Sequence, residues 1–181
     1  MSTNDWNIDP AHSGVHFSIR HLVSKVRGRF AKLSGTIHAD EGDLTRSVVE
    51  ATIDVASVDT GTAQRDAHLR SPDFFDAERF PEIRFRSTRI EKVSDDRYRV
   101  IGQLTIRDVT REVPLDVEHG GRAKDPWGNE RLGFIAKAAI DRKDFGLQWN
   151  QVLETGGVMV GDRVDIELEL QAVRSAAAKV A

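Results

Sequence analysis

The chain has 181 residues, of which 39% are hydrophobic and 30% charged, and its formal net charge is −3. This length suits one domain, residues 1–181, and the weak negative charge predicts no nucleic-acid partner. The chain has no cysteine, which excludes a disulfide framework, a thiol nucleophile and a cysteine-ligated zinc site.

The N-terminal residues Met-Ser-Thr-Asn-Asp-Trp lack the basic and apolar regions of a signal peptide. No apolar run approaches the ~20 residues that a membrane-spanning helix needs. We therefore expect a cytoplasmic protein with no membrane-spanning segment.

Period-two alternation of apolar and polar residues dominates the chain and predicts half-buried strands. Tight turns such as Gly120-Gly121 and Asp125–Asn129 separate several of them, which favours antiparallel pairing. The eight expected strands, in chain order, contain residues 15–19, 26–30, 49–55, 83–85, 98–106, 113–117, 132–140 and 164–170.

One segment, residues 60–80, departs from this pattern and predicts a short helical interruption. Asp59, Thr60 and Thr62 are candidate N-caps for a short helix near Ala63 to Arg70. Ser71 and Pro72 then resemble the start of a second helical turn. Because this segment is rich in phenylalanine, we interpret it as an apolar lid. Residues 173–181 are expected to be a frayed tail.

Eight long alternating strands favour a closed barrel over a sandwich, because closure removes exposed sheet edges. A barrel of about eight strands is wide enough to be filled by side chains or to hold one small ligand. Small residues recur on the inward-facing rows and predict that the interior keeps some volume. They are Gly28, Ala51, Gly102, Ala136 and Ala138.

A basic segment, residues 10–39, contains no Asp or Glu and allows two interpretations. It could bind an anion. Alternatively, the row Lys25, Arg27 and Arg29 could face the acidic row at 165, 167 and 169 if the first and last strands close the barrel. We favour the second interpretation, since exposed charge rows are usually solvated surface.

Few residues are candidates for catalysis, metal binding or cofactor binding. Arg65, Asp66 and His68 could act as an acid–base group, but no nucleophile motif accompanies them, so a structural clasp is the preferred interpretation. His12 and His16 have the spacing of metal ligands on a helix, but they lie on a predicted strand, so we expect no metal site. Neither phosphate-binding nor dinucleotide-binding glycine motifs occur, and we expect no cofactor.

Several separated motifs resemble the YceI-like family. They are Trp6-x-Ile8-Asp9-x-x-His12-Ser13, Val26-x-Gly28-x-Phe30, Arg65-Asp66-x-His68-Leu69, Phe80-Pro81, Leu104-Thr105-Ile106-Arg107 and Phe145-Gly146-Leu147-x-Trp149-Asn150. The resemblance extends from Trp6 to about Val173. It implies an all-β fold, an eight-stranded antiparallel lipocalin-like barrel, and binding of a polyisoprenoid chain in its lumen. Many members carry a secretory signal, so the resemblance here implies a cytoplasmic branch.

The function expected from these observations is non-catalytic binding of a long-chain isoprenoid or similar lipid, for transport, storage or sensing. The chain could also form a homodimer. One alternative is a hydrolase or isomerase acting on an isoprenoid phosphate or ester, and another is an interaction protein with a collapsed interior. The expected lining residues are Phe17, Phe30, Phe74, Phe75, Phe85, Phe134, Ala136, Ala138 and Trp149, with Arg20 and His21 as weaker candidates for the ligand's head.

Overall fold

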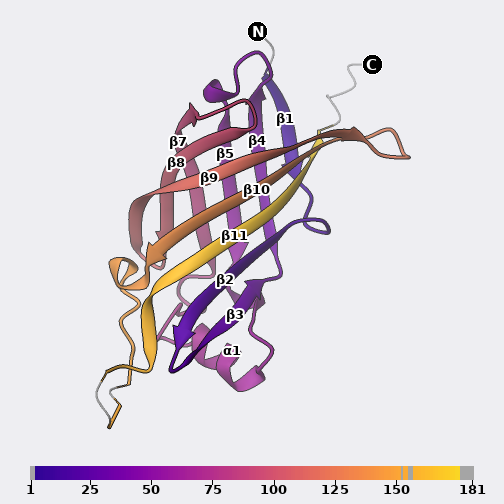
Figure 1. Ribbon diagram of the computed structural model, residues 1–181. Helices are drawn as coiled ribbons and strands as arrows, with labels where there is room; N and C mark the ends of the chain where they lie inside the picture. Colours follow the sequence, from indigo (N-terminus) through magenta and orange to yellow (C-terminus); the bar gives the residue numbers. More distant parts are fainter. Residues whose placement is uncertain (1–2, 152, 155–156, 176–181) are drawn as a thin grey trace.

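The structure, a computed structural model, describes residues 3–151, 153–154 and 157–175. Eight strands form a closed antiparallel ring (Figure 1). In ring order they are β1 (Thr3–Ile8), β4 (Leu33–Asp40), β5 (Val48–Asp54), β7 (Glu82–Lys92), β8 (Arg97–Ile106), β9 (Val109–Lys124), β10 (Glu130–Asp141) and β11 (Val160–Arg174). β1 closes the ring by pairing with β11, with Trp6 opposite Arg174. The predicted closed antiparallel barrel is confirmed.

Three further strands lengthen the wall of the barrel beyond β1. β2 (Gly14–His21) pairs with the first part of β11, whereas β1 pairs with its last part. β3 (Ser24–Phe30) continues from β2, and the two-residue β6 (Val58–Asp59) pairs with the end of β3. The long strand β11 therefore carries two different neighbours along one edge, as Figure 1 shows.

The number of ring strands was predicted correctly, but the membership was not. The segments 15–19 and 26–30 belong to the wall extension, whereas the ring contains β1 and β4, which were not predicted. β1 is rich in Asn and Asp, which strands usually disfavour. In β4 the inward row includes Gly35 and the small Ala39, so its hydrophobic signal is weak.

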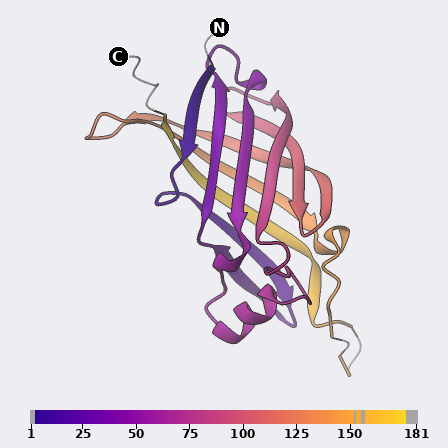
Figure 2. The same ribbon diagram turned by 180° about the vertical axis from the view of Figure 1, so that it is seen from behind.

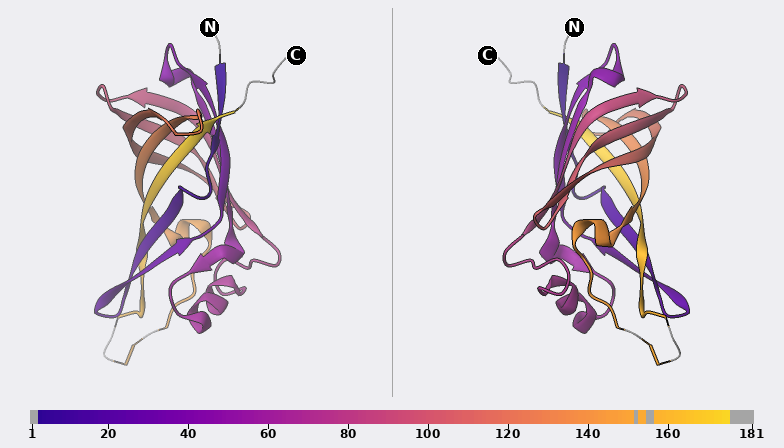
Figure 3. Two further views of the ribbon diagram at one scale, coloured as in Figure 1. Left: turned by 90° about the vertical axis from the view of Figure 1, so that its right-hand side faces the viewer. Right: turned by 90° about the vertical axis from the view of Figure 1, so that its left-hand side faces the viewer.

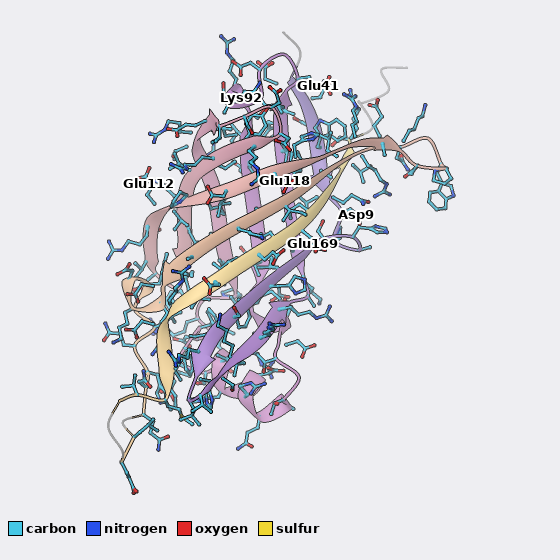
Figure 4. The ribbon with its side chains drawn as sticks, viewed as in Figure 1. Asp9, Glu41, Lys92, Glu112, Glu118 and Glu169 are labelled. Atoms are coloured by element: carbon cyan, nitrogen blue, oxygen red, sulfur yellow. The ribbon has the colours of Figure 1, made fainter. Side chains whose placement is uncertain are left out.

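The alternation in sequence becomes an inside and an outside of the barrel. On β10 and β11, Ala136 pairs with Leu168 and Ala138 with Ile166, and these side chains face inward. The intervening pair, Lys137 and Glu167, faces the other way. Figure 4 places the labelled acidic side chains of β9 and β11, such as Glu118 and Glu169, on the outside of the ribbon.

The predicted facing of the basic and acidic rows is wrong, because β2 lies between them. Glu167 is opposite His16 of β2, and His16 is in turn opposite Arg29 of β3. Arg29 instead lies near Asp59 of β6, with Nε 3.8 Å from the carboxylate. The first and last strands do meet, but the first strand is β1 and not the one that carries the basic row.

The helical interruption is α1 (Ala63–Arg70), as predicted. It lies beyond one end of the barrel, near β3 (Figures 1 and 2). Thr62 is its N-cap residue but makes no side-chain capping bond. The predicted second helical turn after Ser71 is wrong: residues 71–79 form consecutive turns, and the Ser71 hydroxyl donates to the His68 carbonyl.

The first residues of the predicted tail belong to the barrel. Val173 and Arg174 lie in β11, and the Ser175 N–H donates to the Asp5 carbonyl at 2.8 Å. The rest of the predicted tail, residues 176–181, lies outside the described residues.

Candidate functional site: an apolar lumen

The barrel encloses an elongated lumen with a cavity volume of about 240 Å³. Its walls come from the inward rows of the ring strands and of β2, for example Phe17 on β2, Val113 and Leu115 on β9, and Ile166 and Leu168 on β11. Among the described residues that line it, only Ser47, Tyr98 and Arg142 carry a polar side-chain group. The lumen is thus an elongated apolar cavity, and it is larger than the ~150 Å³ engineered cavity that accepts benzene in another protein.

Trp6 is completely buried and belongs to a hydrophobic cluster with Ile37, Ala39 and Leu132, which line the lumen. The guanidinium groups of Arg122 and Arg174 lie 5.7 and 4.9 Å from the centre of its ring. Both arginines form ion pairs with Glu41 and Glu130, which balance their charge. Trp6 therefore lies next to a charged network in which both arginines have acidic partners.

One end of the lumen is covered by α1 and the turns that follow it (Figure 3). Leu69, Phe74 and Phe75 from this segment line the cavity. Phe75 meets Phe30 of β3 edge-on, with ring centres 5.6 Å apart. The phenylalanine-rich segment thus lies where the lid interpretation places it.

The polar residues of α1 hold it in place. Asp66 accepts hydrogen bonds from the N–H and hydroxyl of Thr60, at 2.8 and 2.6 Å, and Arg65 donates to the hydroxyl and carbonyl of the same residue. His68 Nε2 lies 2.8 Å from a carboxylate oxygen of Asp73. Asp66 and His68 therefore serve different partners, which supports the clasp interpretation.

Eight of the eleven predicted site residues lie in the cavity lining, and three lie elsewhere. The lining includes Phe17, Phe30, Phe74, Phe75, Phe85, Phe134, Ala136 and Ala138. Trp149 packs behind the lid, with its ring centre 4.6 Å from His68 and 5.4 Å from Phe74. Arg20 and His21 lie at the end of β2, beside Gly161 and Val160, outside the lining. Contact of any of these residues with a ligand stays a prediction.

Two of the small inward residues do not leave free volume. A Cβ atom on Gly28 would lie 2.5 Å from the Phe17 ring, and one on Gly102 would lie 2.5 Å from the Phe85 ring. These glycines make room for rings of neighbouring strands. Ala51, Ala136 and Ala138 do border the cavity, so the small-residue argument holds for the alanines and fails for the glycines.

Sequence reasoning missed Arg142, which lines the lumen near its lid end and is only 2% exposed. It follows directly after β10 and continues the inward row Ala136, Ala138 and Ile140. A charged residue at the end of an apolar row was the signal available in the sequence.

Outside the lumen, a group of polar and charged side chains around Arg131 connects segments that are distant in sequence. Arg131 donates to Asp9, Gln171 and Asp125 at 2.8–2.9 Å. The hydrogen bond from Arg131 lowers the pKa of Asp9 to about 2. At Asp125, burial raises the pKa of the carboxyl group. Hydrogen bonds from Asn129, Arg131 and Trp127 outweigh this effect and lower the pKa of Asp125 to about 2.

The described residues give little support to metal chemistry. Among them, no group of three or more His, Asp or Glu side chains is placed to hold a metal ion. His12 Nδ1 instead lies 2.7 Å from Asp9, and His38 Nδ1 lies 2.6 Å from Asp5. In the same described part of the chain, no helix is long and apolar enough to cross a membrane.

The fold and the lumen define a closed antiparallel barrel that encloses one apolar, ligand-sized cavity. Residues 6–172 match the family of YceI-like domains, and the chain belongs to that family. A UPF0312 protein of Staphylococcus epidermidis is 40% identical over 164 residues, which cover 90% of this chain and 93% of the relative. A UPF0312 protein of Staphylococcus aureus is 38% identical over 165 residues, covering 90% and 94%.

Solved structures share the fold. BcnA of Burkholderia cenocepacia is 26% identical, with a TM-score of 0.80 over 91% of this chain and 98% of the other. The YceI protein of Campylobacter jejuni is 30% identical, with a TM-score of 0.71 over 86% and 90%. A polyisoprenoid-binding domain from Saccharophagus degradans is 16% identical, with a TM-score of 0.71 over 96% and 100%, and shows likeness of fold alone.

Proposed function

We propose that the protein binds a long-chain isoprenoid, or a similar amphiphilic lipid, in the lumen without transforming it. The observation that carries this proposal is the cavity itself: about 240 Å³, and of the described side chains that line it all but three are wholly apolar. Burial of a hydrocarbon chain against such a surface removes the chain from water, which is favourable.

The energetics favour long chains over short ones. At about 0.8 kcal/mol per buried carbon group, one isoprene unit contributes roughly 3–4 kcal/mol before costs. Association itself costs about 4–15 kcal/mol in lost freedom of motion. One unit alone therefore binds poorly, whereas several consecutive units bind well even where the wall supplies no hydrogen bond.

The comparisons support this ligand class indirectly. The Saccharophagus degradans domain with the same fold is named as a polyisoprenoid-binding domain. Family membership brings that ligand class to this chain as a proposal, and the apolar lining gives it a physical basis.

The enzyme alternative has weaker support. A hydrolase or isomerase using Asp66 and His68 needs these groups to act together on a ligand. Instead, Asp66 accepts from Thr60, and His68 lies beside Asp73 and the ring of Trp149. The alternative of an interaction protein with a collapsed interior conflicts with the open cavity.

Transport, storage and sensing all fit a binding protein of this kind. A cytoplasmic location and a homodimer remain predictions from the sequence.

The proposal is tested by gentle purification, extraction of the protein with organic solvent, and mass spectrometry of the extract. We expect a long-chain lipid in near-stoichiometric amount, and we expect the delipidated protein to take up an added polyprenol. A folded protein that yields no lipid and takes up none would refute the proposed function.

A further inference from the structure

The turn between β2 and β3 carries two apolar side chains that point into water. His21 pairs with Ser24, so the turn consists of Leu22 and Val23 alone. Val23 is 98% exposed and Leu22 is 43% exposed. The hairpin projects at the same end of the barrel as α1 (Figures 1 and 3). Among the described residues, the most exposed large apolar side chain is therefore at the tip of this hairpin.

The backbone of this turn is unfavourable for the residues that it contains. Leu22 has a φ of 55°, in the left-handed region. Two-residue hairpin turns normally place Gly, Asn or Asp where φ is positive, and a leucine is disfavoured there. Neither side chain is compensated by burial within the protein. Local strain together with exposed hydrocarbon is more typical of a functional surface than of a structural turn.

A neighbouring segment adds to the exposed apolar surface. The Leu22 N–H donates to the Met159 carbonyl at 2.9 Å, and Val158, the preceding residue, is also exposed. Three of the six exposed large hydrophobic side chains among the described residues thus lie in or beside this turn. The other three lie on other elements: Val93, Trp127 and Ile135.

The hairpin is also basic. Arg20, Lys25 and Arg27 flank the tip and are exposed. Glu154 is the one acidic residue in the adjoining segment 146–160. Acidic groups of the neighbouring strands have other basic partners, so the described side chains leave the hairpin's positive charge uncompensated. These pairs are Asp59 with Arg29, Asp162 with Arg142 and Lys143, and Asp165 with Arg163.

We propose that this tip docks the protein on an anionic membrane surface. Leu22 and Val23 enter the headgroup region, while Arg20, Lys25 and Arg27 contact lipid phosphates. Apolar side chains flanked by basic ones are typical of segments that bind at the membrane interface. A protein partner fits less well, because so small a tip buries far less than the about 800 Å² per partner of a stable interface.

Docking at this tip would bring the lid end of the lumen to the bilayer. Phe17 and Ile19 of β2 line the lumen, as do Phe74 and Phe75 of the lid segment. A lipid that enters or leaves at this end then has a short path through bulk water. The docking adds a partner to the proposed function, but it does not require a ligand in the lumen.

The experiment measures co-sedimentation of the full chain with phosphatidylcholine vesicles that contain or lack phosphatidylglycerol. We expect binding to the anionic vesicles, which salt weakens, and little binding to the neutral ones. Leu22→Asn/Val23→Ser is expected to bind at least about tenfold more weakly. Its free energy of unfolding should be unchanged or higher, because Asn tolerates a positive φ. A purely structural turn predicts no change in vesicle binding.

Matched controls lie at the opposite end of the barrel, in the turn between β7 and β8, where Figure 4 labels Lys92. Val93 is exposed there, and Val93→Ser should leave vesicle binding unchanged. Lys25→Gln/Arg27→Gln should weaken binding to anionic vesicles about tenfold and reduce its salt dependence. Lys92→Gln/Arg97→Gln makes the same change in net charge and should have little effect.

The outcomes separate docking from lumen binding. Docking is overturned by absent binding to anionic vesicles, by unchanged binding in either folded tip variant, or by equal losses in the matched controls. A dimer that Leu22→Asn/Val23→Ser dissociates, without vesicle binding, assigns the tip to a second copy and also overturns it. Protein that yields a lipid on solvent extraction but ignores vesicles loses the docking proposal alone. Protein that binds vesicles but neither yields nor takes up lipid loses the proposed function alone.

Discussion

Filling the lumen from its own wall should separate ligand binding from folding. The perturbation is the double variant Ala136→Phe/Ala138→Phe on β10. Both alanines line the cavity, and Ala136 is 1% exposed. Two rings added there occupy space that a ligand chain needs, while the backbone pairing with β9 and β11 stays available.

The two expected effects have opposite signs. Displacing one isoprene unit removes roughly 3–4 kcal/mol of burial, which weakens binding about 100-fold to 1,000-fold. An empty, dry cavity of about 240 Å³ costs on the order of 6 kcal/mol in folding stability. Partial filling should therefore raise the free energy of unfolding of the ligand-free protein, by about 1–2 kcal/mol.

The assays are titration of a polyprenol into delipidated protein and urea unfolding of the same sample. Ala139→Phe is the matched control, because Ala139 is exposed on the outer face of β10 and should leave affinity unchanged. Undiminished affinity in the folded double variant, or an equal loss in the control, would contradict the placement of the ligand along β10.

Three further predictions concern stability. Gly102→Ala should lower the free energy of unfolding by about 1–3 kcal/mol in urea, because the new Cβ would lie 2.5 Å from both the Arg86 carbonyl oxygen and the Phe85 ring; no loss would contradict this close packing. Trp6→Ala should lower it by about 3–5 kcal/mol, because this completely buried side chain fills its own hydrophobic cluster; a loss below 1 kcal/mol would contradict that. The lowered pKa of Asp9 stabilises the fold above about pH 4, and this contribution disappears as the pH falls through about 2. Arg131→Met should therefore weaken the pH dependence of stability between these values in acid titrations followed by circular dichroism, and an unchanged profile would contradict the assignment.

The barrel and most of its lining could be predicted because both follow from alternation along single strands. A residue on an inward row faces the lumen wherever that strand lies in the ring. This is why Phe85, Phe134 and the alanines of β10 were placed correctly without knowledge of the strand order. The clasp around Asp66 was also predictable, since its partner Thr60 lies only six residues away.

Other features depend on contacts between distant segments, which alternation does not encode. Trp149 lies next to turn residues in sequence, and only the fold shows that it packs behind the lid against His68. Gly28 is needed because the Phe17 ring of the neighbouring strand occupies the space that a Cβ atom would take. Arg142 was missed because its role requires carbonyl groups that lie as far away as Gly161.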